Sequence, residues 1–194
     1  MNRFLALISL ISGFLFFSQQ SFADAELFKV YKQCHDELEF RCDVIREVNG
    51  EKNIIYKEMK SPMIKRLNQA YYHVKISCGS PCQGHDFIAR DKDKDDFTQE
   101  FIAVDAKNNC LIETDTEKNK IIARQLNTSK IYTLISTKNQ IFQQVPIREI
   151  AQYTIFQRSS YFDQNGNLVL LADYEAESGG KSQFKRVFPN PCKL

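Results

Sequence analysis

Six cysteines are the residues of this chain whose type and spacing could do chemistry. Two of them, Cys78 and Cys82, flank Gly79, Ser80 and Pro81 in the run ISCGSPCQG. Two thiols this close together could be a redox-active pair, half of a metal site, or a disulfide that closes a turn. The function of the protein depends on which of these they are.

The residues around the pair favour a disulfide. The run resembles the C-G-P-C motif of thioredoxin-like oxidoreductases with one residue inserted, but the segment after it, QGHDFIARD, does not predict the helix that makes such a cysteine nucleophilic. Strands are predicted at 71–78 and 84–90, so residues 79–81 become a hairpin loop. Residues directly opposed across such a hairpin lie about 4.5 Å apart, within disulfide reach. We therefore predict that Cys78 pairs with Cys82.

Metal binding by the same region would use Cys78, Cys82 and His85, with His35 beside Cys34 as a further ligand. Thiolates and imidazoles suit zinc. Close thiols outside the cytoplasm more often form disulfides, so the sequence predicts no resident metal and no cofactor.

An acidic run, DKDKDDFTQEFI, places Asp91, Asp93 and Asp95 at alternate positions, like the start of an EF-hand loop. Such a loop needs Gly at position 6 and Glu at position 12, where this chain has Asp96 and Ile102. We expect a solvated loop of mixed charge. The run DQNGN at 163–167 is explained by an Asn-Gly turn.

The N-terminus predicts a signal peptide at residues 1–23. Arg3 is followed by an apolar run from Phe4 to Phe17 and then by the small residues Ser21 and Ala23 at the −3 and −1 positions of a cleavage site after Ala23. Cleavage after Ala25 is the less favoured alternative, and the apolar run is shorter than the roughly 20 residues of a membrane span. The mature protein, residues 24–194, is expected to be one β-rich domain in the periplasm or secreted, without a membrane span.

All six cysteines follow the predicted cleavage site, and an even number in an exported chain predicts disulfides. Besides Cys78–Cys82, we predict the pairs Cys34–Cys42 and Cys110–Cys192. The second pair would tie down a tail, PNPCKL, that its prolines keep out of regular structure.

Short β-rich runs separated by turn clusters predict an antiparallel, mainly β fold, as a meander, a sandwich or an incomplete propeller. Residues 100–136 read as four successive strands, like one propeller blade. The turn clusters are DAKNN, TDTEKN, LNTSK and DQNGN. The predicted strands are 71–78, 84–90, 100–105, 110–114, 120–126, 130–136, 140–145, 151–158, 167–175 and 183–188.

The first part of the chain is less regular. Residues 26–34 predict a short N-terminal helix, and LEFRCDV predicts a strand that buries Leu38, Phe40, Cys42 and Val44; one helix over 26–48 is the alternative. An Asn-Gly turn within EVNGEKNIIYK predicts a hairpin, and 63–70 a helical turn.

Composition and motifs narrow the function. The chain has 26 Lys and Arg against 24 Asp and Glu, well interspersed, so no basic footprint for nucleic acid is present. The sequence contains no G-x-S-x-G, no H-E-x-x-H and no phosphate loop. Catalytic groups can assemble in space, but no residue is marked as catalytic. The aromatic residues at 71–72, 156 and 161–162 could face a partner, although burial on both sides is favoured.

The runs ISCGSPCQGHDFIARD and EFIAVDAKNNCLIETD resemble exported proteobacterial proteins that share a C-G-x-P-C hairpin and an A-V-D strand. The resemblance covers residues 74–126. It implies a small periplasmic β domain and brings no activity, site residue or disulfide scheme.

Taken together, these features predict a non-enzymatic, disulfide-stabilised protein that binds another protein, as an immunity protein binds a toxin or an inhibitor binds an envelope hydrolase. The alternatives are a thiol-disulfide enzyme using Cys78 and Cys82, and a structural accessory protein of the envelope.

Overall fold

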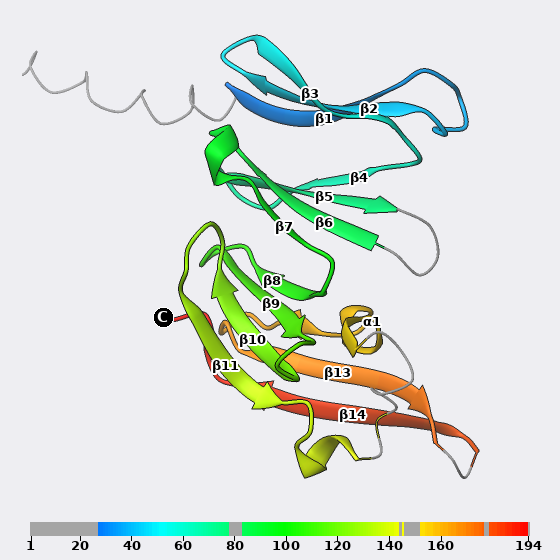
Figure 1. The fold of residues 1–194 in the computed structure, drawn as a ribbon, viewed down its shortest axis with the longest axis vertical. Helices are drawn as coiled ribbons and strands as arrows, with labels where there is room; N and C mark the ends of the chain where they lie inside the picture. The colour runs from blue at the N-terminus through cyan, green and yellow to red at the C-terminus, as the bar shows by residue number, and fades with distance from the viewer. Residues whose placement is uncertain (1–26, 78–82, 144, 146–151, 177–178, 194) are drawn as a thin grey trace, which may run out of the picture.

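A computed structural model describes residues 27–77, 83–143, 145, 152–176 and 179–193, and its strands form four antiparallel sheets (Figure 1). Sheet A contains β1 (Phe28–Cys34), β2 (Cys42–Val48) and β3 (Glu51–Met59); sheet B contains β4 (Met63–Arg66), β5 (Tyr71–Ser77), β6 (Gln83–Ala89) and β7 (Asp96–Thr98). Sheet C contains β8 (Phe101–Asp105), β9 (Cys110–Asp115), β10 (Lys120–Gln125) and β11 (Ile131–Ser136); sheet D contains β12 (Tyr161–Phe162), β13 (Leu168–Glu175) and β14 (Lys181–Phe188). Two short 3-10 helices, η1 (Lys92–Lys94) and η2 (Gln140–Phe142), and the helix α1 (Gln152–Gln157) complete the described elements.

The sheets are stacked in chain order, from A at one end to D at the other (Figure 1). Within each sheet the strands follow one another as a meander. Successive side chains of a strand point to opposite faces, so a strand in an inner sheet is covered on both sides. Strand β6 shows this plainly: Phe87 packs toward sheet C, Ile88 packs toward sheet A, and both are fully buried.

Three apolar clusters hold the stack together. The first joins sheets A and B through Phe28, Val30, Val44, Tyr72, Val74 and Ile88. The second joins sheets B and C through Tyr71, Phe87, Ala89, Phe101, Leu111 and Leu126.

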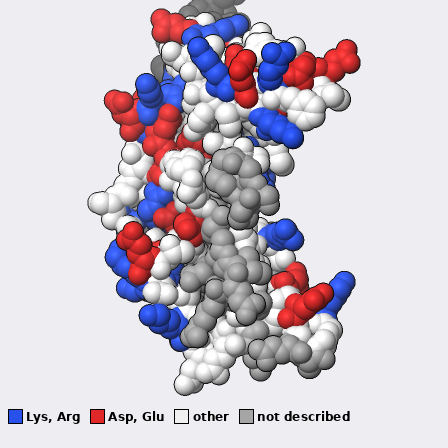
Figure 2. All heavy atoms as spheres, turned by 45° about the vertical axis from the view of Figure 1, so that its right-hand side comes forward, with Lys and Arg blue, Asp and Glu red and all other residues white. Residues whose placement is uncertain are grey.

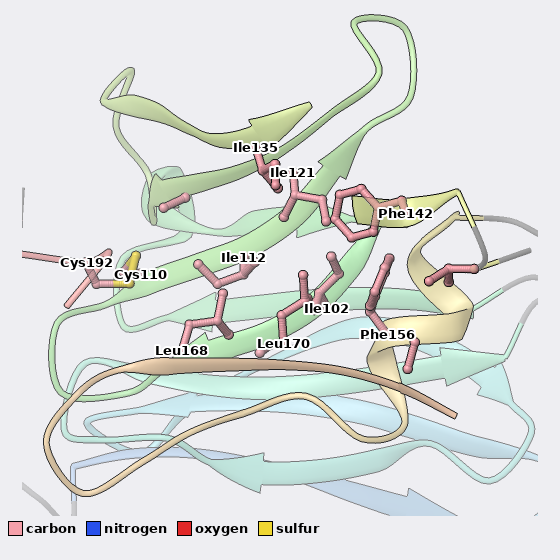
Figure 3. Close-up of a cluster of buried hydrophobic side chains, with 14 residues drawn as sticks. Ile102, Cys110, Ile112, Ile121, Ile135, Phe142, Phe156, Leu168, Leu170 and Cys192 are labelled. Atoms are coloured by element: carbon pink, nitrogen blue, oxygen red, sulfur yellow. A yellow bond between two sulfur atoms is a disulfide. The ribbon is translucent and has the colours of Figure 1, made fainter. Parts of the chain in front are cut away.

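The third and largest cluster lies between sheets C and D (Figure 3). Ile102, Ile112 and Ile121 from sheet C face Leu168 and Leu170 from sheet D. Phe156 of α1 and Phe142 of η2 fill one end of this layer, while the disulfide between Cys110 and Cys192 closes the other.

Asparagine residues make most of the tight turns. Asn49 and Gly50 connect β2 and β3 with positive φ angles of 53° and 86°, which is the pattern of the Asn-Gly hairpin that the sequence predicts. Asn109, Asn119 and Asn127 also have positive φ, and each lies in one of the predicted turn clusters. Asn tolerates this left-handed region better than most residues.

The mainly β, antiparallel prediction is confirmed, and the four-stranded segment predicted at 100–136 is sheet C. The predicted N-terminal helix at 26–34 is wrong, because this segment is strand β1. The burial of Phe28 and Val30 has a period of two, and β1 pairs with β2 along its whole length. The apolar residues of this segment recur at the spacing of a helix, but pairing with β2 stabilises the strand instead.

Three other local predictions are corrected. Residues 63–66 form the edge strand β4 instead of a helical turn. The predicted strand at 140–145 contains the 3-10 helix η2. Asn139 caps the start of this helix, because its side chain accepts a hydrogen bond from Ile141 N. The predicted strand at 151–158 contains α1. Helix α1 lies at one end of the largest cluster, where Phe156 is completely buried. This packing outweighs the β propensity of the segment.

The predicted signal peptide and the Cys78–Cys82 pair lie outside the described residues. Within the described residues, no helix has the length and apolar character needed to cross a membrane. On the face seen in Figure 2, basic and acidic side chains are interspersed, as the composition suggests.

Candidate functional site

A disulfide closes the hairpin between β1 and β2. Cys34 and Cys42 are directly opposed at the end of the two strands, and the structure joins them as the sequence predicts. Residues 35–41, HDELEFR, form the loop beyond this bond. We call them the clasped loop.

The clasped loop is ordered from inside by one carboxylate. Asp36 accepts hydrogen bonds from the backbone N–H groups of Phe40 and Arg41, each at 2.8 Å. These donors, Phe40 first, lower the pKa of Asp36. His35 N donates to Arg41 O at 2.8 Å as well, so the two sides of the loop are joined by backbone hydrogen bonds just above the disulfide.

Neighbouring segments hold the loop from outside. Lys32 Nζ lies 2.6 Å from Glu39 Oε2, and Ser61, just after β3, donates its backbone N–H to Glu39 O at 2.8 Å. His35 Nε2 contacts Asp43 Oδ2 at 3.1 Å. The backbone N–H of Glu58, followed by the ring of His35, lowers the pKa of Asp43. The loop is therefore attached to β1, to β2 and to the segment just after β3.

Two large apolar side chains project from this ordered frame. Leu38 is 71% exposed and Phe40 is 49% exposed. Lys60 Nζ lies 4.8 Å above the ring of Phe40, where a cation is attracted by the ring face. The sequence analysis predicted both residues on the buried face of a strand, and this is wrong, since β2 begins only at Cys42.

This arrangement is suited to binding. A rigid loop that already holds apolar side chains in water loses little conformational entropy when a partner covers them. Aromatic side chains such as Phe40 are enriched at protein interfaces, and burial of a neighbouring aliphatic side chain such as Leu38 adds apolar area. The predicted Cys34–Cys42 disulfide located the loop. The exposure of Leu38 and Phe40 was missed, because alternation of apolar and polar residues in sequence does not distinguish a strand from the end of a hairpin.

Two histidines form a second polar group, between sheets B and C. His73 Nε2 lies 2.8 Å from His85 Nδ1, and the side-chain amide nitrogen of Gln157, on α1, lies 2.6 Å from His85 Nε2. His85 stacks on Phe101, with ring centroids 4.3 Å apart, and is 1% exposed. Burial, with a smaller repulsion from nearby lysines and between the rings, lowers the pKa of His73 to about 4 and of His85 to about 3.

Between sheets A and B, Tyr56 donates its hydroxyl to Asp86 Oδ2 at 2.6 Å. Burial raises the pKa of Asp86 to about 6. Perturbed carboxyl groups are candidates for acid–base catalysis, but Asp86 is only 6% exposed. The surface hollow found in this part of the described structure is lined by Arg46 and residues 90–94, not by Asp86 or Tyr56. We assign the pair a structural role.

The EF-hand-like acidic run uses its carboxylates within the protein. Asp91 pairs with Lys94 at 2.9 Å, Asp95 forms an ion pair with Arg46, and Asp96 contacts Arg124 at 2.6 Å. Within the described residues, no three His, Cys, Asp or Glu side chains are grouped to hold a metal ion. His35 and His85, considered together in the metal hypothesis, lie in the clasped loop and on β6 of sheet B.

The second predicted turn motif has the conformation of a turn. Asp163 Oδ1 accepts from the backbone of Asn165 and Asn167 at 2.9 and 2.8 Å, and Gly166 has φ of 80°. The hydrogen bond from Asn167 is the main cause of the lowered pKa of Asp163.

The aromatic pairs behave differently from one another. Tyr71 and Tyr72 are both buried, one toward sheet C and the other toward sheet A, as the favoured interpretation expected. Phe162 packs against the largest cluster, whereas Tyr161 is 49% exposed.

No protein-family model and no curated protein matches the sequence. The function of the clasped loop is therefore inferred from its geometry.

Proposed function

We propose that the protein is an exported, non-enzymatic binding protein that recognises another protein through the clasped loop, with Leu38 and Phe40 as the anchors. One observation carries the proposal: two large apolar side chains stand in solvent on a loop held by a disulfide, an internal carboxylate and an ion pair. The predicted signal peptide gives the compartment, periplasmic or secreted, and the two described disulfides suit an oxidising environment.

The shape of the loop bears on the kind of partner. A substrate-like protease inhibitor presents an extended segment to the cleft of the enzyme. In the clasped loop, Glu39 has φ of 57°, and its carbonyl is held by Ser61. This turn supports insertion of Leu38 and Phe40 together into a pocket of the partner. Such a pocket could belong to a toxin or to a hydrolase, so the loop is compatible with an immunity protein and with an inhibitor.

Affinity capture with matched variants tests the proposal. Mature wild-type protein, the variant Leu38→Ser/Phe40→Ser and the control Ile131→Ser/Tyr132→Ser are used as baits on extracts of the native exported fraction. Ile131 and Tyr132, on β11, are 54% and 46% exposed, so the control removes a similar apolar surface elsewhere. We expect a protein that the wild type and the control retain and the loop variant loses.

The captured protein is then purified and its affinity measured. Loss of two anchor residues should weaken binding by at least about 30-fold, the equivalent of a hot spot of about 2 kcal/mol. Equal affinity of wild type and loop variant, or loss only in the β11 control, would refute the role of the loop.

A further inference from the structure

A surface hollow of about 460 Å³ is lined in part by Val48, at the end of β2 away from Cys42 and the clasped loop. It is formed by β2, β3 and the segment 90–94 that follows β6. The helical turn η1 within this segment reaches up beside sheet A (Figure 1). The lining residues are Arg46, Val48, Asn53, Arg90, Asp91, Lys92, Asp93 and Lys94.

The lining of the hollow contains four basic side chains and two carboxylates. Lys94 pairs with Asp91 at 2.9 Å. Arg90 Nη2 donates at 3.1 Å to Asn49 Oδ1, a neutral acceptor. Lys92 forms no ion pair with any described residue, and Asp93 is the one unpaired carboxylate of the lining. The rim therefore presents Arg90 and Lys92 to solvent.

Arg46 gives the hollow a built donor. Its side chain is 7% exposed, and its Nη2 forms an ion pair with Asp95. The Nε–H group is buried and has no acceptor among the described residues. A buried charged donor without a partner is unfavourable, and the planar guanidinium is the donor that fits carboxylate and phosphate oxygens best.

We propose that this hollow binds an oxyanion, a phosphate or carboxylate group of a small ligand, with Arg46 Nε, Arg90 and Lys92 as the donors. The segment that resembles a calcium loop thus lines a site of the opposite kind: Asp91 holds Lys94 and Asp95 holds Arg46 by ion pairs, which leaves Arg90 and Lys92 available to an anion. The site shares no residue with the clasped loop, so its test is independent of the test of the proposed function.

NMR titration of the mature protein tests the site directly. The Nε–H resonances of arginine are followed while inorganic phosphate or, in a separate series, acetate replaces chloride at constant ionic strength and pH 7.5. We expect the Arg46 Nε–H resonance to move downfield and to saturate. The anion with the lower Kd identifies the ligand group as phosphate or carboxylate.

Variants separate the site from general charge effects. Arg90→Gln and Lys92→Gln, both at exposed positions, should each weaken binding roughly 5- to 10-fold, because each removes a charge-assisted contact. Lys138→Gln, an exposed lysine near η2, removes the same charge far from the hollow and should leave the Kd unchanged. If neither anion moves the Arg46 resonance more than chloride does, or if Lys138→Gln weakens binding as much as Lys92→Gln, the proposal is overturned.

Discussion

His73 Nε2 and His85 Nδ1 lie 2.8 Å apart in the layer between sheets B and C, and Gln157 Nε2 lies 2.6 Å from the other nitrogen of His85. With the amide donating to His85 Nε2, His85 carries its hydrogen on Nδ1 and donates it to His73. The two ring nitrogens that could take a proton, His73 Nε2 and His85 Nε2, therefore already accept hydrogen bonds. Protonation of either ring therefore breaks a buried hydrogen bond.

This relationship predicts loss of stability in acid. Both pKa values, about 4 and about 3, lie below the unfolded value of 6.5, so the unfolded chain binds more protons as the pH falls below about 6.5. Lys65 and Lys75 on the neighbouring strands add positive charge, Thr98 lies opposite His85, and no described carboxylate contacts either ring. Between pH 7 and pH 5 each histidine should cost about 2 kcal/mol of unfolding free energy.

Urea denaturation of the variant His73→Phe/His85→Phe measures this effect. The variant keeps the aromatic stack with Phe87 and Phe101 and should no longer lose stability between pH 7 and 5. The slope that remains should have the opposite sign, because Asp86 is more favourable in acid. A slope as steep as that of the wild type would assign the acid sensitivity to other groups.

Asp86 predicts the opposite dependence on pH. Its folded pKa of about 6 exceeds the ordinary value of 3.8, so its contribution to stability is complete below about pH 4 and is lost as the pH rises through 6. Asp86→Asn keeps an acceptor for Tyr56 and removes the buried charge. At pH 7 it should be more stable than the wild type by up to about 3 kcal/mol, and at pH 3.5 the two should be equal. Chemical denaturation at both pH values measures the difference, and the variant should retain the histidine-dependent slope.

Removal of the Cys34–Cys42 disulfide is expected to loosen the clasped loop. Cys34→Ser/Cys42→Ser removes a constraint on a short loop, which stabilises by about 2.5 kcal/mol in the chain-entropy model. The hydrogen bonds from Phe40 N and Arg41 N to Asp36 should then open more often. Hydrogen exchange of these two amides should become faster while that of β5 and β6 is unchanged; equal protection in both proteins would show that Asp36 orders the loop without the disulfide.

The second disulfide should act on global stability. Cys110 and Cys192 are 82 residues apart in sequence, and closing such a loop contributes about 4.5 kcal/mol through the unfolded chain. Cys192→Ser should lower the melting temperature by roughly 10 °C in oxidising buffer. Under reductant the variant and the wild type should melt together. Equal melting in oxidising buffer would contradict a tethering role.

The pairing of Cys78 with Cys82 remains a prediction, and thiol titration tests it. Native protein should contain no reactive thiol, and peptide mapping without reduction should recover residues 78 and 82 in one linked fragment. Two accessible thiols with lowered pKa at these positions would support the thiol-disulfide enzyme instead.

Much of the architecture could be predicted from local signals. Residues 100–136 contain short apolar runs separated by Asn-containing turns, so sheet C follows from the sequence. Among the segments predicted wrongly, 26–34, 38–41 and 151–158 contain short apolar runs that fit more than one periodicity. Pairing of β1 with β2 and burial of Phe156 decided these segments, and both are interactions with distant parts of the chain.

By itself the sequence determined the class of fold, the export signal as a prediction, and two cysteine pairings that the structure contains, because turns, strand periodicity and cysteine count are local or compositional properties. Only the tertiary structure decided which groups share a space. The exposure of Leu38 and Phe40 depends on where β2 begins, and the unpaired Nε of Arg46 depends on how η1 lies against sheet A. These contacts depend on how the four sheets pack against one another. The burial of a side chain therefore cannot be read from a short stretch of sequence.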